Sequence, residues 1–236
     1  MTTVTVITGA NKGLGFETAR RLIEAGHTVY AGARDARRGE QAAAALGARP
    51  LLIDITDDAS VAAAAAQVRA EEDRVDVLVN NAGVAGPAAP AGELTAADLR
   101  DVFDTNVFGA VRTTRAFLPL LQRAARPTIV NVSSALGSLT INADPAAHSD
   151  LLPAWAPLLA YNSSKAALNM LTTVYAQSFP RIRVVSVDPG FTATDLNGRQ
   201  GTQTVEEGAV PIVAAATAGP GTPSPAFIGA TGTVPW

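Results

Sequence analysis

A tyrosine and a lysine, Tyr161 and Lys165, stand four residues apart in the stretch AYNSSK. In a helix this spacing places both side chains on one face. Two interpretations are open: a packing pair whose amine reaches solvent, or a phenol whose acidity is changed by a neighbouring cation. Arginines outnumber lysines by sixteen to two, although the arginine fork differs from a compact ammonium in geometry and hydration. The rare lysine favours the second interpretation, in which the pKa of Tyr161 falls toward the pH that general acid–base catalysis requires.

A glycine-rich stretch near the N-terminus, TGANKGLG, joins an apolar run to a helical one. Gly9 permits a tight turn, Gly13 lets the backbone approach a pyrophosphate, and Gly15 lets the helix pack on the strand. The free N–H groups at the helix start then favour phosphates. The stretch lacks the Gly-Lys-Ser/Thr ending of a P-loop, and a glycine turn without a ligand is the alternative. We predict a dinucleotide phosphate site formed by Gly9, Asn11, Lys12, Gly13, Leu14 and Gly15.

The second expected strand ends in YAGARD, where a site for NAD usually offers a carboxylate to the ribose 2′-hydroxyl. Here Arg34 follows the strand, and Lys12 can reach the same region. Two cations suit a 2′-phosphate, so we predict that NADP(H) is preferred over NAD(H). Asp35 argues against this preference unless it caps the next helix. After the third strand, Asp54 and Ile55 could bracket an adenine amino group and its ring face.

Short β-branched runs alternate with longer alanine-rich helical stretches along the chain. Strands are expected at 4–8, 27–33, 49–53, 75–79, 127–133 and 182–187. Their continuous apolar character predicts burial on both faces, and the alternation predicts right-handed crossovers and a parallel sheet. Two segments depart from this alternation of strands and helices: residues 137–158 and the Gly/Pro-rich tail from 218. In open parallel sheets ligands bind beyond the carboxyl ends of the strands, where the residues named above lie.

The composition excludes several classes of function. The 236 residues carry a net charge of −3 with a pI of about 5.4, so we expect neither a nucleic-acid partner nor a membrane partner. There is no cysteine, and the histidines His27 and His148 stand far apart, so no metal site is expected. The N-terminus enters a strand-like run at once and leaves no room for a signal peptide, which favours a cytoplasmic location.

Six motifs follow one another along the chain: TGANKGLG (8–15), NNAG (80–83), TNVFG (105–109), NVSSALG (131–137), YNSSK (161–165) and DPGFTATD (188–195). In this order they resemble the short-chain dehydrogenase/reductase family, and details such as TGANKGLGF and the C-terminal tryptophan resemble its carbonyl reductase branch. The resemblance implies a single α/β domain over 1–236. Its sheet would be a Rossmann-type, doubly wound parallel sheet of about seven strands, with helices on both faces.

The resemblance also implies a catalytic set of Asn106, Ser134, Tyr161 and Lys165. The family's serine precedes a glycine by three residues, which selects Ser134 over Ser133. Its hydroxyl would donate a hydrogen bond to a substrate carbonyl oxygen that gains charge as hydride arrives, and Tyr161 would protonate this oxygen. Asn106 would help to hold a water that connects Lys165 to solvent, and an asparagine inside a helical stretch also indicates a local kink.

Further cofactor contacts follow from the same resemblance. They are Asn81, Ala82, Gly83, Pro189, Gly190, Thr192 and Thr194, together with Tyr161 and Lys165. Gly83 would pass close to the cofactor ribose, the Thr192 backbone would hold the nicotinamide carboxamide, and Thr194 would reach the phosphates. The NNAG asparagines are interpreted as mainly structural, since their amides can replace backbone hydrogen bonds in the sheet.

Between Ser134 and Tyr161 the separation is 27 residues, which is longer than in many family members. The surplus lies at about 137–158, where Leu151, Leu152, Trp155 and the prolines could form an apolar wall near the substrate. Trp155 and Phe191 join Ser134 and Tyr161 as predicted substrate contacts. In the carbonyl reductase branch a longer segment here is associated with monomers, so the resemblance favours a monomer although this segment is of intermediate length; a homodimer or tetramer is the alternative.

Three functions are weighed. The first is NADPH-dependent reduction of a ketone, aldehyde or quinone, and the second is oxidation of a hydroxylated metabolite by the reverse reaction. The third is a cofactor-sensing protein without catalysis. Retention of Ser134, Tyr161 and Lys165 favours an enzyme with a small carbonyl or alcohol substrate.

Overall fold

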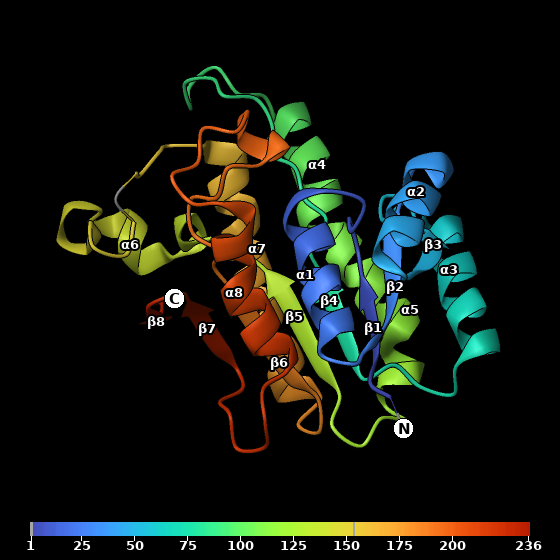
Figure 1. Ribbon diagram of the computed structural model, residues 1–236. Coiled ribbons are helices and arrows are strands. Elements are labelled where there is room, and N and C mark those ends of the chain that lie inside the picture. The colour runs from blue at the N-terminus through green and yellow to red at the C-terminus, as the bar shows by residue number, and fades with distance from the viewer. Residues whose placement is uncertain (1, 153) are drawn as a thin grey trace.

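The computed structural model describes residues 2–152 and 154–236, and their strands form one eight-stranded sheet in the order β3-β2-β1-β4-β5-β6-β7-β8 (Figure 1). The strands are β1 (Val4–Ile7), β2 (Thr28–Ala33), β3 (Arg49–Leu52), β4 (Val77–Asn80), β5 (Thr128–Val132), β6 (Arg183–Val187), β7 (Ala226–Gly229) and β8 (Gly232–Thr233). The main helices are α1 (Gly13–Glu24), α2 (Ala36–Leu46), α3 (Asp58–Glu71), α4 (Ala96–Phe103), α5 (Gly109–Leu121), α6 (Leu139–Ala143), α7 (Leu159–Ser178) and α8 (Val205–Ala216).

All six expected strands are present, and β1 to β7 run parallel. The strand order reverses direction between β1 and β4, which confirms the doubly wound arrangement. The described residues hold eight strands rather than about seven. Both additional strands come from the Gly/Pro-rich tail: β7 pairs with β6, and the two-residue β8 is antiparallel to β7.

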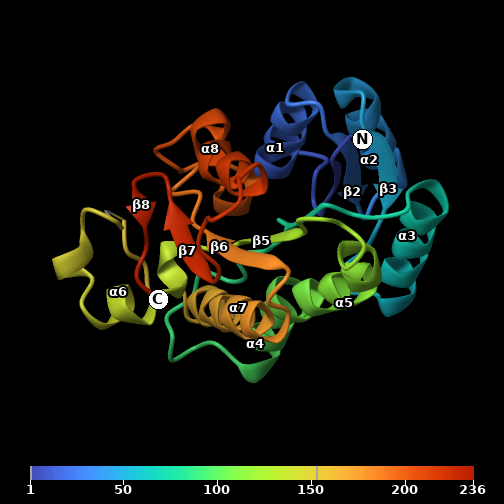
Figure 2. The ribbon, with the colours of Figure 1, turned by 90° about the horizontal axis from the view of Figure 1, so that it is seen from below.

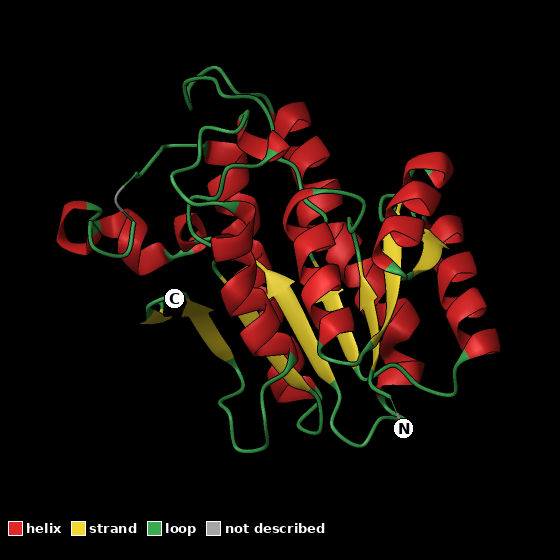
Figure 3. Ribbon diagram, in the orientation of Figure 1, coloured by secondary structure: helices red, strands yellow, loops and turns green. Residues whose placement is uncertain are grey.

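Helices cover both faces of the sheet, as Figures 2 and 3 show, with α1, α2 and α8 on one face and α3, α5 and α7 on the other. Each face has its own hydrophobic core. On one side the strands contact Leu22 of α1 and Ile212 of α8, and on the other they contact Val68 of α3 and Phe117 of α5. These side chains are fully buried, so burial on both faces is confirmed for β1, β2, β4, β5 and β6. It is wrong for β3, which lies at the edge of the sheet and exposes Arg49, Pro50 and Leu52.

The segment 137–158 packs beside the C-terminal strands rather than lying free over the sheet. Ile141 of α6 joins a small third core with Phe227 and Val234, and Leu151 and Leu152 pack against it. These two leucines therefore belong to this core more than to an exposed apolar wall. Pro153, one of the prolines expected in that wall, lies outside the described residues. Within the described part of the chain, no helix is both long and apolar enough to span a membrane.

Candidate active site

The glycine loop runs from β1 into α1, and Gly9 and Gly13 have positive φ values of 65° and 56°. Close packing explains two of its glycines: a Cβ on Gly9 would lie 3.0 Å from Cα of Ala82, and one on Gly15 would lie 3.0 Å from Cα of Ala10. A Cβ on Gly13 would meet only the Thr194 side chain, at 3.7 Å or more. The start of α1 therefore leaves room beside Gly13, and its first N–H groups suit a dinucleotide phosphate.

Lys12 and Arg34, the two cations expected at a 2′-phosphate, act on different carboxylates in this structure, those of Asp195 and Asp54. Lys12 lies 2.9 Å from the carboxylate of Asp195, and both side chains are exposed. Hydrogen bonds from Thr56 lower the pKa of Asp54, and the charge of Arg34 lowers it further. An exposed ion pair contributes little stability, so the pair with Asp195 does not commit Lys12 to that position.

Asp35 does cap the next helix. It is the N-cap of α2, and its carboxylate accepts the Arg38 backbone N–H at 2.8 Å. The main objection to a 2′-phosphate site is thereby weakened. Ile55, by contrast, is 8 % exposed and packs against Gly109, so its side chain offers little surface to an adenine ring.

The NNAG asparagines hold the sheet together, as expected. Asn80 of β4 donates to the Asn131 side chain of β5 at 2.9 Å and accepts from the Thr113 hydroxyl at 2.6 Å. The Asn81 amide donates to the carbonyls of Thr8 and Gly9, at 2.8 and 3.1 Å. These bonds join the ends of β1, β4 and β5, beyond which the predicted site lies.

Asn106 lies in a short π-helical turn (Asp104–Phe108) between α4 and α5, which confirms the expected kink. It is 2 % exposed, and its amide is fixed on two sides. Its Oδ1 accepts the Val84 N–H, while its Nδ2 donates to the Val84 carbonyl and to the Ser164 hydroxyl, each at 2.9 Å. Single π-helical turns within helices are frequent at functional sites. Here the turn ties the fourth helix to the part of α7 that carries Lys165.

Tyr161 and Lys165 lie in the first two turns of α7. The Lys165 Nζ is 5.5 Å from the centre of the Tyr161 ring and donates to the Val132 carbonyl at 2.8 Å. The Ser134 hydroxyl, just past the end of β5, lies close enough to the Tyr161 phenol to lower its pKa. Ser133 instead is buried and donates to Asn169 at 2.7 Å. The structure therefore brings Ser134, Tyr161 and Lys165 together, and the hydroxyl of Ser133 is used elsewhere.

Burial controls the acidity of this pair. Burial raises the pKa of Tyr161 above its ordinary value, and the charge of Asp188 raises it further, whereas the Ser134 hydroxyl opposes both. Burial lowers the pKa of Lys165 to about 8. Lys165 is thus still a cation at neutral pH and Tyr161 keeps its proton. The expected lowering of the Tyr161 pKa is not found, because loss of water around the phenol outweighs any help from the neighbouring ammonium.

Asp188 belongs to this site and was missed from the sequence. It follows β6 and is 9 % exposed, and burial raises the pKa of its carboxyl, against which the backbone N–H groups of Ala135 and Gly190 act. These N–H groups belong to the turn after Ser134 and to the loop after β6, and the charge of Asp188 acts on both Tyr161 and Lys165. Its position directly after a buried strand could have identified it, because a carboxylate in such a place is buried and needs hydrogen-bond donors or a cation beside it.

The loop after β6 packs tightly against the segment that precedes α8. Thr192 is 4 % exposed, its N–H donates to the Gly190 carbonyl at 2.9 Å, and its carbonyl accepts from Asn197 at 2.9 Å. Thr194 caps the short helix at 195–197 and also faces Gly13 of the glycine loop. The ends of β1 and β6 are thereby brought together, as a dinucleotide bound across both would need.

The predicted substrate contacts outside the catalytic set are less close to it. The Trp155 indole donates to Asn142 at 3.0 Å, and Trp155 lines a shallow pocket with Leu159 and Ser163. These two residues lie two positions either side of Tyr161, so they face the opposite side of α7. Trp155 therefore lies near the side of α7 that is opposite Tyr161. Phe191 is 39 % exposed beside the catalytic end of the sheet.

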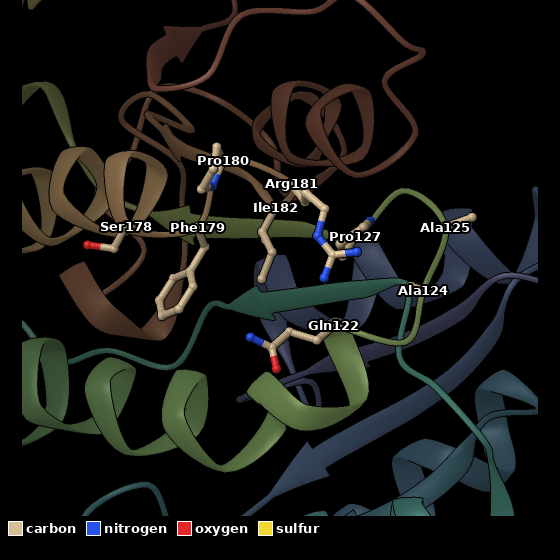
Figure 4. Close-up of a pocket in the computed structure, with 9 residues that line it drawn as sticks. All are labelled: Gln122, Ala124, Ala125, Pro127, Ser178, Phe179, Pro180, Arg181 and Ile182. Atoms are coloured by element: carbon tan, nitrogen blue, oxygen red, sulfur yellow. The ribbon is translucent and has the colours of Figure 1, made fainter.

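A second cavity, of about 230 Å³, lies at the end of the sheet where the strands begin (Figure 4). Pro127 and Ile182 line it, and they come just before β5 and β6. It thus opens at the amino ends of these strands, away from the site. Among the described residues, no group of three or more His, Asp or Glu side chains could hold a metal ion.

Comparisons with known proteins agree with this geometry. The family model described as short chain dehydrogenase matches residues 3–149 and 150–204. The short-chain dehydrogenase anuI of Penicillium roqueforti is 41 % identical, over 91 % of this chain and 88 % of its own length. The (+)-neomenthol dehydrogenase of Arabidopsis thaliana is 34 % identical, over 86 % of this chain and 88 % of its own.

Among solved structures, the NADPH-bound carbonyl reductase from chicken fatty liver superposes with a TM-score of 0.85 and 28 % identity, covering 100 % of this chain and 99 % of that one. Salutaridine reductase from Papaver somniferum gives 0.82 and 30 %, covering 95 % and 99 %. The chain belongs to the short-chain dehydrogenase/reductase family. It is an oxidoreductase of a family that uses a nicotinamide cofactor.

Proposed function

We propose that this protein is an NADPH-dependent reductase that acts on the carbonyl group of a ketone, aldehyde or quinone. The observation that carries the proposal is the cluster of Ser134, Tyr161 and Lys165 at the end of β5, beside a glycine loop that opens α1. The names of the relatives, which include reductases and an NADPH-bound carbonyl reductase, also support it.

The residues of the crevice suit such a cofactor. We assign the phosphates to the glycine loop, the 2′-phosphate to Lys12 and Arg34, and the adenine amino group to Asp54. The segment 81–83, with Tyr161 and Lys165, would hold the nicotinamide ribose. In the loop of Pro189, Gly190, Thr192 and Thr194, the Thr192 backbone would hold the nicotinamide carboxamide and Thr194 would reach the phosphates. Bound NADPH would supply the hydride for the carbonyl carbon.

Side chains of the protein would bind the carbonyl oxygen of the substrate and supply its proton. The hydroxyls of Ser134 and Tyr161 would both donate hydrogen bonds to the carbonyl oxygen, which stabilises the negative charge that develops there. Tyr161, protonated at neutral pH, would pass its proton to that oxygen and complete the alcohol. The phenolate left behind would be stabilised by the ammonium of Lys165. Return of a proton from solvent is assigned to Lys165 and Asn106.

The reverse reaction, oxidation of an alcohol, is kept as a second function. Its support is that the curated relatives include enzymes named neomenthol dehydrogenase. The same residues serve both directions, with Tyr161 as acid in one and base in the other. A location in the cytoplasm and a monomeric state complete the proposal. Equilibrium sedimentation of the purified protein tests the monomer.

A panel of ketones, aldehydes and quinones, followed by NADPH absorbance and repeated with NADH, tests the function. Tyr161→Phe should abolish turnover while NADPH still binds. Tyr175→Phe is the matched control, since Tyr175 lies on the same helix but stacks on Phe179. Turnover that survives in Tyr161→Phe contradicts the mechanism, and faster turnover with NADH contradicts the cofactor preference.

A further inference from the structure

Asn142, on α6, uses its whole side-chain amide in four hydrogen bonds. Its Nδ2 donates to the carbonyls of Leu136 and Ser138, each at 2.7 Å. Its Oδ1 accepts from the indole of Trp155 at 3.0 Å and from the side chain of Asn162 at 3.3 Å. An asparagine amide offers two donors and two acceptor positions, so its bonding capacity is filled. The amide therefore joins three segments: the turn after β5, the chain that leads into α7, and α7 itself.

The turn after β5 carries one of the proposed catalytic hydroxyls. The Leu136 N–H donates to Oγ of Ser134 at 3.2 Å, and Ser134 is the N-cap of the short helix at 135–137. A hydroxyl that accepts a bond in this way keeps its own proton for another acceptor, such as a substrate oxygen. Because Asn142 holds the Leu136 carbonyl, it fixes the residue whose N–H orients Ser134.

The other side of the junction leads to the second hydroxyl. Asn162 follows Tyr161 directly, in the first turn of α7. Its amide bond to Asn142 therefore ties the start of this helix to the turn that orients Ser134. The two segments are 27 residues apart in the chain, so backbone continuity alone does not hold their hydroxyls at a set separation.

The proposed reaction needs that separation to be fixed, because the hydroxyls of Ser134 and Tyr161 both donate to one carbonyl oxygen. We propose that Asn142 is a positioning residue, which holds the Ser134 hydroxyl at the distance from Tyr161 that this shared oxygen requires. This inference rests on the proposed function and adds to it a residue that acts through Ser134 rather than on the reacting atoms. Asn142 lies outside the six motifs that indicated the rest of the site.

The test is whether the effect of Asn142 depends on Ser134. The kcat is measured with NADPH and menadione, or with the fastest ketone of the panel if menadione is not reduced. Asn142→Ala should lower kcat about 10- to 100-fold, because a misplaced hydroxyl stabilises the developing charge poorly. In a Ser134→Ala background the same substitution should lower kcat about threefold or less, since the hydroxyl that it would misplace is gone. The Kd of NADPH should not change in either background.

Thr140→Val is the matched control. Thr140 is exposed on the same short helix, and its hydroxyl donates to the main-chain oxygen of Trp236 at 2.7 Å rather than to the catalytic turn. The variant removes a hydrogen bond of α6 and keeps the size of the side chain, so it should have the wild-type kcat. Asn142→Ser, which retains one donor, serves if Asn142→Ala does not fold.

Amide hydrogen exchange gives a second readout, which needs neither cofactor nor substrate. The Gly137 N–H donates to the Ser134 carbonyl, and the Asn162 N–H donates to the Leu158 carbonyl, each at 2.8 Å. Both N–H groups should exchange faster in Asn142→Ala than in wild type, because the junction that ties their segments together is lost. The control variant should exchange at the wild-type rates at both positions.

Three results overturn the proposal: a kcat that Asn142→Ala leaves unchanged, a fall in kcat that is equal in the two backgrounds, and faster exchange confined to α6. The second and third would give Asn142 a structural role only. A wild-type protein that reduces no carbonyl of the panel would instead overturn the proposed function. The two failures are therefore distinguishable.

Discussion

Replacing Lys165 by methionine should stabilise the folded protein at neutral pH while it abolishes turnover. Lys165 is 4 % exposed, and burial lowers its pKa from 10.5 to about 8. A depressed lysine pKa means that the charged form is less favourable in the folded protein than in the unfolded chain. The Lys165→Met variant keeps the length of the side chain and removes this charge.

The size of the effect follows from the structure. The difference between pKa values of 10.5 and about 8 corresponds to about 3 kcal/mol of unfolding free energy at pH 7. Methionine also leaves the Val132 carbonyl without the 2.8 Å hydrogen bond from Nζ, which costs about 1 kcal/mol. The net gain is about 2 kcal/mol, or about 4–8 °C in unfolding temperature for a chain of this size.

The pH dependence gives the sharper test. Between pH 8 and 10.5 the unfolded chain holds a proton on this lysine that the folded protein has released, so wild type gains stability as the pH rises. Urea unfolding at pH 7.0 and 9.5 should therefore show the advantage of Lys165→Met shrinking by about 2 kcal/mol.

The other lysine is the control. Lys12 is exposed and pairs with Asp195, so Lys12→Met should change the unfolding free energy by well under about 1 kcal/mol at both pH values. A Lys165→Met variant that is less stable than wild type at pH 7 refutes the reasoning. So does an advantage that is the same at pH 7.0 and 9.5.

Three further predictions concern single residues of the site. Asp188→Asn removes a charge that raises the pKa of Tyr161, so the alkaline limb of the kcat–pH profile for carbonyl reduction should move to lower pH; an unmoved profile would leave Asp188 a structural role only. Arg34→Ala should raise the Kd of NADPH about 10- to 100-fold and leave NADH unchanged, with Arg37→Ala, on the exposed face of α2, as the calorimetric control. Gly137→Ala would place a Cβ 2.6 Å from the Lys165 backbone carbon, and the resulting shift of α7 should cost about 1–3 kcal/mol in urea unfolding and lower kcat; a stable, fully active variant would show that α7 moves freely.

Much of the sheet could be predicted because β1 to β6 carry a signal in their own sequences. Runs such as VTVIT are rich in β-branched residues and carry no charge, which is typical of strands buried in a parallel sheet. β7 and β8 have no such signal. Ala226–Gly229 becomes a strand because β6 offers it an edge, and the glycines and prolines around it predict a loop. Pairing that depends on a distant neighbour is outside what a local pattern contains.

In the candidate site, too, features carried by local motifs could be predicted, and features that depend on distant contacts could not. Ser134 and Tyr161 were predicted from motifs, and the structure brings their hydroxyls together. The pair of Lys12 with Asp195 joins residues 183 positions apart, and the side of α7 that Trp155 covers depends on how residues 137–158 pack. The direction of the Tyr161 pKa shift could not be predicted either. It depends on how much water reaches the phenol, and the spacing of a tyrosine and a lysine does not determine that.

One unfavourable feature of the folded chain lies at the end of β5. There the buried ammonium of Lys165 contacts the Val132 carbonyl, and burial lowers the pKa of this lysine. The buried charge weakens the protein where the proposed cofactor would contact it. A ligand that pairs with this group binds the folded state alone, so its binding free energy adds to stability. On this reasoning, NADP⁺ should raise the unfolding temperature less in Lys165→Met than in wild type, because the buried charge that the cofactor relieves has already been removed.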